Sequence, residues 1–268
     1  MEKNKNIFFT PETIKRISRD VKTIMKNPLT ENGIYYIHNM DNVLKGYAMI
    51  IGPKDTPYEN GFYFFEFDFP NDYPHSPPNL TFLSNGDNIR FNPNLYRNGK
   101  VCISLLNTWR GEQWTSCQTI STILLTLCTI LNEKPLLNEP GILITDSQLE
   151  PYNIIVGFKN IKVCILDIIE KIEIEHPFSL FKEICFNHFK TNKKHILKNL
   201  KNIEKKAIES TCRDVNGHIY TNIYKLSVQI NVSTCSDIKN KIKDIILNDK
   251  PNNNSNTNTN DEQKHVEF

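Results

Sequence analysis

Apolar positions near the start of the chain follow the period of a helix. They come after Thr10 and Pro11, a pair that favours a capped helix start. The positions with this spacing are Ile14, Ile17, Val21 and Ile24. An amphipathic helix with a basic outer face is therefore predicted over 11–26.

Short runs of aromatic and branched residues come next, separated by turn signals. Such runs are typical of strands, and short connections between them imply an antiparallel meander. The predicted strands cover 34–38, 46–51, 61–69 and 80–83. Between the last two strands, the segment 69–78 holds four prolines, which exclude a helix or a central strand and predict a rigid loop.

The second half of the chain reads mainly as helices. An apolar central helix is predicted over 119–131, one or two helices over 152–174, and a Lys-rich helix over 178–210 after a break at His176-Pro177. The later predictions are a turn at 216–217, a strand or hairpin over 219–232, and a last helix capped by Ser236 and ending near 247.

We divide the chain on this basis into four parts. These are an N-terminal arm at 1–10, a main domain at 11–177, a C-terminal extension at 178–247 and a tail at 248–268. The tail is rich in Asn and has almost no apolar residues, so disorder is predicted for it.

Composition narrows the class of protein. Of 268 residues, 39% are hydrophobic and 23% charged, and the net charge of +2 gives no overall attraction to nucleic acid or membrane. The seven cysteines are scattered without a C-x-x-C pair, which favours neither a disulfide framework nor a metal site. No signal peptide is evident, so an intracellular protein of the cytoplasm or nucleus is expected.

One cysteine stands in a distinctive local setting. Pro93 and Gly99 place turns on either side of Tyr96, so the amide of Asn94 can be held near the sulfur of Cys102. We expect this sulfur to be exposed. The layout is suited to acyl transfer.

This segment resembles the ubiquitin-conjugating enzymes, whose nucleophilic cysteine follows His-Pro-Asn at the same spacing. Here Asn92 stands in place of the histidine, which puts the local loop geometry in question. The turn at 52–61 and the proline loop are also similar to that family, so the resemblance runs from about residue 14 to about 141. The segments 105–109 and 138–141 look most like the conjugating domain of large hybrid conjugating-enzyme/ligase proteins.

The resemblance implies an α/β ubiquitin-conjugating fold and assigns roles to particular residues. Cys102 would take ubiquitin from an activating enzyme as a thioester and pass it to a substrate lysine or a ligase. Asn94 would stabilise the oxyanion by about 3 kcal/mol, or else only brace its own loop. Glu139 and Tyr96 would face the incoming lysine, although Glu139 can also be an ordinary solvated residue. No cofactor is expected, because ATP is used by the activating enzyme.

The resemblance also places a shared surface for the activating enzyme and ligases on the first helix and two loops. The residues at these positions are Lys15, Arg16, Arg19, His75 and Ser116. The basic residues can equally form an ordinary solvated helix face. The Lys-rich run after 178 offers solvated lysines or targets for self-modification, and it lacks the interleaved aromatics that favour nucleic-acid binding.

Alternatives of other kinds stay open at this point. The modifier can be a ubiquitin-like protein such as SUMO, or the chain can be a non-catalytic variant that binds ubiquitin as a scaffold. A further possibility is that the extension supplies ligase-like substrate binding. The presence of both Cys102 and Asn94 argues against the non-catalytic variant.

Overall fold

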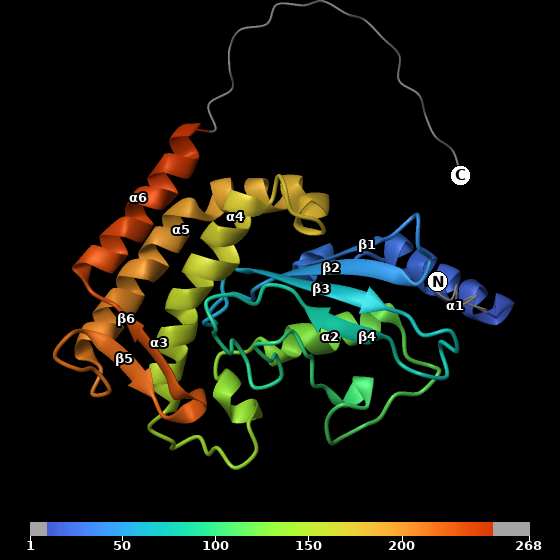
Figure 1. Ribbon diagram of the computed structural model, residues 1–268, viewed down its shortest axis with the longest axis horizontal. Helices are drawn as coiled ribbons and strands as arrows, with labels where there is room; N and C mark the ends of the chain where they lie inside the picture. Colours follow the sequence, from blue (N-terminus) through green and yellow to red (C-terminus); the bar gives the residue numbers. More distant parts are fainter. Residues whose placement is uncertain (1–9, 249–268) are drawn as a thin grey trace, which may run out of the picture.

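The computed structural model describes residues 10–248, with side chains up to Ile245 in the last helix. The predicted arm and tail fall almost entirely outside the described residues. Figure 1 shows a sheet at the centre of the molecule, α1 and α2 beside it, and the C-terminal helices gathered at the other end. Among residues 10–248, no helix is both long and apolar enough to cross a membrane.

The first helix has the predicted bounds. Helix α1 covers Pro11–Lys26, and the Thr10 side chain accepts a hydrogen bond from the backbone N–H of Thr13 at 3.2 Å. This contact satisfies one of the free N–H groups at the helix start. Ile17 and Ile24 are buried on its inner face.

The sheet is the predicted antiparallel meander. Its strands are β1 (Ile34–His38), β2 (Lys45–Ile51), β3 (Phe62–Asp68) and β4 (Asn79–Phe82), paired in that order. The central helix α2 (Ile120–Ile130) follows, capped by Thr119 in a reciprocal capping box with Thr122. The fold class predicted from the sequence is confirmed.

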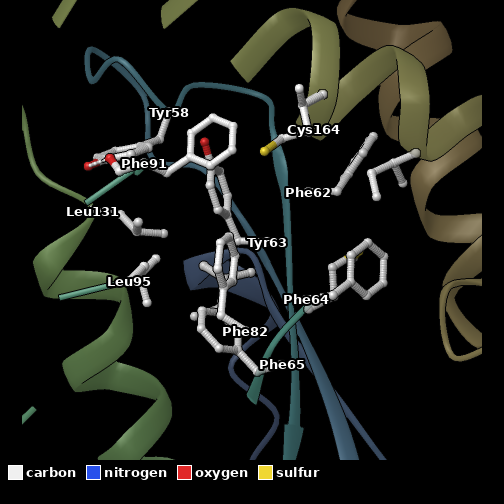
Figure 2. Packing of buried hydrophobic residues seen from close by; sticks show 14 of the residues in the cluster. Tyr58, Phe62, Tyr63, Phe64, Phe65, Phe82, Phe91, Leu95, Leu131 and Cys164 are labelled. Atoms are coloured by element: carbon white, nitrogen blue, oxygen red, sulfur yellow. Dashed lines mark hydrogen bonds between the residues drawn. The ribbon is translucent and has the colours of Figure 1, made fainter. Parts of the chain in front are cut away.

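Both faces of the sheet are buried. Figure 2 shows Tyr63 and Phe65 on the side of α2, and Phe62 and Phe64 on the opposite side, as strand alternation requires. The ring of Phe64 lies 4.8 Å from that of Phe178, centroid to centroid. Short helix η5 (Phe178–Phe181) and helix α5 (Lys182–Glu209) therefore cover the second face, and the extension shares the core of the main domain.

The predicted helical stretch after residue 150 is one continuous rod. Helix α3 (Leu149–Lys159) continues through a π-helical segment, η4 (Asn160–Asp167), into α4 (Ile168–Lys171). In η4, the buried Asn160 accepts a hydrogen bond from the Tyr63 hydroxyl at 2.7 Å and donates one to the Glu59 carbonyl at 3.0 Å. A side chain at Gly61 would collide with Asn160, because an added Cβ would lie 1.8 Å from its Oδ1. The Asn160 side chain thus fixes the continuous helix of α3, η4 and α4 against the sheet.

The end of the described chain forms a hairpin and a helix. Strands β5 (His218–Thr221) and β6 (Leu226–Gln229) enclose a short turn, η6 (Ile223–Lys225), and pack beside α3 (Figure 1). The last helix, α6, covers Val232–Asn248, so the prediction of a start at Ser236 is wrong. Asn231 is the cap instead, since its Oδ1 accepts from the Thr234 N–H at 2.9 Å.

Candidate active site

The structure brings Asn94 and Cys102 together through two reciprocal contacts. The Asn94 side-chain amide donates to the Cys102 carbonyl at 2.6 Å, and the Cys102 N–H donates to the Asn94 carbonyl at 2.8 Å. Gly99, with a φ of 85°, closes the turn that makes this pairing possible. A fixed amide therefore stands next to the backbone of Cys102, and its closeness to the sulfur stays a prediction.

The expectation of an exposed sulfur is wrong for this conformation. Cys102 is only 2% exposed. The segment after Cys102 folds back onto the residues on either side of the cysteine. The Thr108 hydroxyl accepts a hydrogen bond from the Ile103 N–H and donates one to the Val101 carbonyl, both at 3.1 Å. Attack by the thiol on a large partner's carbonyl therefore requires the segments around it to move.

Asn92 makes the turn rigid without the family's histidine. It is fully buried, and its side-chain N–H₂ donates to the Tyr58 hydroxyl and the Ile130 carbonyl, each at 2.8 Å. Its Oδ1 accepts from the backbone N–H of Asn94 at 2.9 Å. The substitution thus preserves a braced loop, which settles the local geometry that the sequence left in question.

Tyr96 and Glu139 are joined through two residues that sequence reasoning missed, Arg90 and Tyr224. The Arg90 guanidinium lies between the rings of Tyr96 and Tyr224, 3.8 and 4.2 Å from their centroids. The Tyr224 hydroxyl in turn donates a hydrogen bond to Glu139 Oε2. No local signal marks Tyr224, because these contacts join distant parts of the chain.

A small cavity opens at this point. Its volume is about 240 Å³, and its lining residues are Arg90, Tyr96, Arg97, Asn98 and Tyr224. Burial, and next the hydrogen bond to Glu139, raise the pKa of the Tyr224 phenol well above its ordinary value, while Arg90 opposes the shift. The phenol is therefore a hydrogen-bond donor across the physiological pH range.

The residues of the predicted partner surface lie on α1 and on two loops that are hydrogen-bonded to each other. Lys15, Arg19 and His75 are exposed, and the Ser116 hydroxyl donates to the Pro74 carbonyl at 3.2 Å. Arg16 differs from the other basic residues, because its guanidinium donates to the Ser116 carbonyl at 2.5 Å and pairs with Asp20. Arg16 therefore braces α1 against the loop, and its role in partner binding stays a prediction.

Fold and site together define an α/β conjugating domain built around one cysteine. The sequence model of the family described as ubiquitin-conjugating enzyme matches residues 16–142, so this part of the chain is a domain of that family. The described residues hold no group of three or more His, Cys, Asp or Glu side chains placed to bind a metal ion.

Known proteins are similar to parts of this chain. Human ubiquitin-conjugating enzyme E2 Z is 40% identical over 60% of this chain and 46% of its own length. The human dual E2 ubiquitin-conjugating enzyme/E3 ubiquitin-protein ligase BIRC6, a hybrid of the predicted kind, is 32% identical over 70% of this chain and 4% of its own. A solved structure of human ubiquitin-conjugating enzyme E2 G1 matches at 30% identity and a TM-score of 0.40, over 46% of this chain and 98% of that one. The chain spans about half the length of the E2 Z relatives it matches.

Proposed function

We propose that this chain is a ubiquitin-conjugating enzyme that carries ubiquitin as a thioester on Cys102 and transfers it to lysine, directly or through a ligase. The observation that carries the proposal is the reciprocal hydrogen bonding of Cys102 and Asn94 inside a domain of that family. Its partners are then ubiquitin, an activating enzyme, ligases and protein substrates, and its setting is intracellular.

The reaction needs little from the protein beyond the thiol and a few fixed dipoles. The Cys102 thiolate takes the acyl group from the activating enzyme's own thioester, so this chain needs no cofactor. When a lysine amine then attacks, negative charge develops on the carbonyl oxygen. The Asn94 amide has two hydrogens, of which one bonds the Cys102 carbonyl, so the other can meet this charge once the segments that cover the buried site have moved.

A charging reaction tests the proposal. The chain is incubated with activating enzyme, ATP and ubiquitin, and a gel without reductant should show an adduct that reductant removes. Cys102→Ala should abolish the adduct. Cys117→Ala is the matched control, because Cys117 is an exposed free cysteine, and it should charge normally. An adduct that persists in Cys102→Ala would refute the assignment of the carrier.

The burial of Cys102 favours one rival, a non-catalytic scaffold that binds ubiquitin. In that case the wild-type chain would bind ubiquitin but gain no adduct under any charging condition. A parallel reaction with SUMO and its own activating enzyme tests the other alternative. Charging by SUMO but not by ubiquitin would change the modifier and leave the site in place.

A further inference from the structure

The hairpin of the extension is fixed against the loop that carries the cysteine. Gln148, just before α3, accepts hydrogen bonds from the Thr221 hydroxyl at 2.7 Å and the Asn222 N–H at 2.9 Å. The Arg97 guanidinium donates to the Tyr224 carbonyl at 2.7 Å. The turn between β5 and β6 thus has one anchor at Gln148, just before α3, and another beside Tyr96.

Tyr224 reaches the site through an uncommon backbone conformation. Its φ is 57° and that of Lys225 is 50°, in the left-handed region that bulky side chains rarely adopt. The conformation places the ring on Arg90 and the hydroxyl on Glu139. A second aromatic contact, with Tyr152 at a centroid distance of 6.2 Å, fixes the ring from another side.

Glu139 is left with one oxygen available. Oε2 accepts from Tyr224, whereas Oε1 receives no hydrogen bond from any described residue. The carboxylate is only partly buried, so Oε1 can meet an incoming group. Since the Tyr224 phenol is a donor at physiological pH, it fixes the direction of the carboxylate without competing for the free oxygen.

We propose that Tyr224 is a positioning residue that holds Glu139 so that Oε1 receives the ammonium group of the substrate lysine. This inference rests on the proposed function and gives the extension a part in the transfer step. Glu139 Oε1 accepts one proton from lysine Nζ and later returns it to water. The neutral amine attacks the thioester carbonyl carbon, the C–N bond forms and the C–S bond breaks. Cys102 leaves as a thiolate, and the second proton lost by the nitrogen neutralises it.

Removing only the Tyr224 hydroxyl tests the inference in the full chain. Wild type, Tyr224→Phe and Tyr220→Phe are charged with ubiquitin, and the purified thioester is then discharged with free lysine or with hydroxylamine, an amine that is already neutral at pH 7.5. Tyr220 is the matched control, because it lies in the same hairpin, is 45% exposed and makes no side-chain hydrogen bond among the described residues.

Charging of Tyr224→Phe should stay within about twofold of wild type, whereas its discharge to lysine should fall about tenfold, which corresponds to about 1.4 kcal/mol. Discharge to hydroxylamine should stay within about twofold, because no ammonium group has to be held. Tyr224→Phe should have no further effect in a Glu139→Gln background, as expected for residues that act through one contact.

Three results would overturn the inference. They are unchanged discharge to lysine, equal slowing of both amines, and additive effects of the two substitutions. Faster charging of Tyr224→Phe would be a fourth, because it would show that the hairpin obstructs the site. If wild type itself does not charge, the proposed function fails and this inference falls with it, which is distinguishable from a normally charged variant with unchanged discharge.

Discussion

The substitution Asn94→Ala tests whether the Asn94 amide stabilises the transition state or only braces its own loop. The side chain makes one hydrogen bond, to the Cys102 carbonyl, and its Oδ1 is buried without a partner. Loss of the hydrogen bond should lower the free energy of unfolding by about 1 kcal/mol. Loss of an oxyanion donor costs about 3 kcal/mol in the transition state, which slows discharge to lysine about 150-fold.

The hydrogen bond from the Asn94 amide to the Cys102 carbonyl sets the lower limit of the slowing expected for Asn94→Ala. If the amide must leave the Cys102 carbonyl to reach the oxyanion, about 1 kcal/mol of the gain is lost and the slowing falls to about 30-fold. The assay is single-turnover discharge of the purified thioester to lysine, with urea unfolding in parallel. Asn98→Ala is the control, since Asn98 is an exposed amide in the same loop. Slowing of less than about threefold, together with the expected loss of stability, would refute the catalytic role and leave only loop bracing.

Two further predictions concern the attachment of the extension. Phe64→Ala should lower the free energy of unfolding by about 3 to 5 kcal/mol, because it leaves a cavity where the Phe64 ring packs against Phe178 and Phe181. Urea unfolding measures this loss, with a substitution at an exposed position, Ile174→Ala, as the control. A loss below about 1 kcal/mol would contradict shared packing. Burial lowers the pKa of His188, so the unfolded chain binds the proton more readily and stability is lost as pH falls below about 6.5. The loss of Tm between pH 7.5 and 5.5 should therefore be smaller in His188→Gln than in wild type, and an equal loss in both would argue against this contribution.

Elements with strong local signals could be predicted from the sequence. The first helix has the predicted bounds because a Thr-Pro start and a regular apolar stripe act within a few residues. The strands agree with prediction to within a residue or two, since aromatic runs and turn residues define them locally. The pairing of Asn94 with Cys102 has the same origin, because a short turn joins the two residues.

Local signals also misled the prediction in one place. Alternating apolar residues up to Val232 favoured a strand, and they hid the cap that Asn231 and Thr234 form at the start of α6. An Asn followed three residues later by Thr is a readable cap signal, so a stricter reading could have found it.

Contacts between distant segments could not be predicted. Nothing near Tyr224 indicates that its hydroxyl meets Glu139, and nothing near Cys102 indicates that the sulfur is buried. The burial of Phe64 by the extension has the same character, because alternation tells which residues share a face but not what covers that face.

The long-range contacts change how the role of the extension can be tested. Treated as an appendage, it could be deleted after about residue 178 to ask whether substrate choice is lost. That deletion would expose Phe62 and Phe64 to solvent and would also remove the hydrogen bond between Tyr224 and Glu139. A loss of activity could then come from unfolding or from impaired transfer, and the assay would not distinguish the two. Tyr224→Phe avoids this, because it removes one hydroxyl and leaves the packing against the sheet intact. Any effect of that substitution confined to lysine discharge therefore reports on the chemistry rather than on the fold.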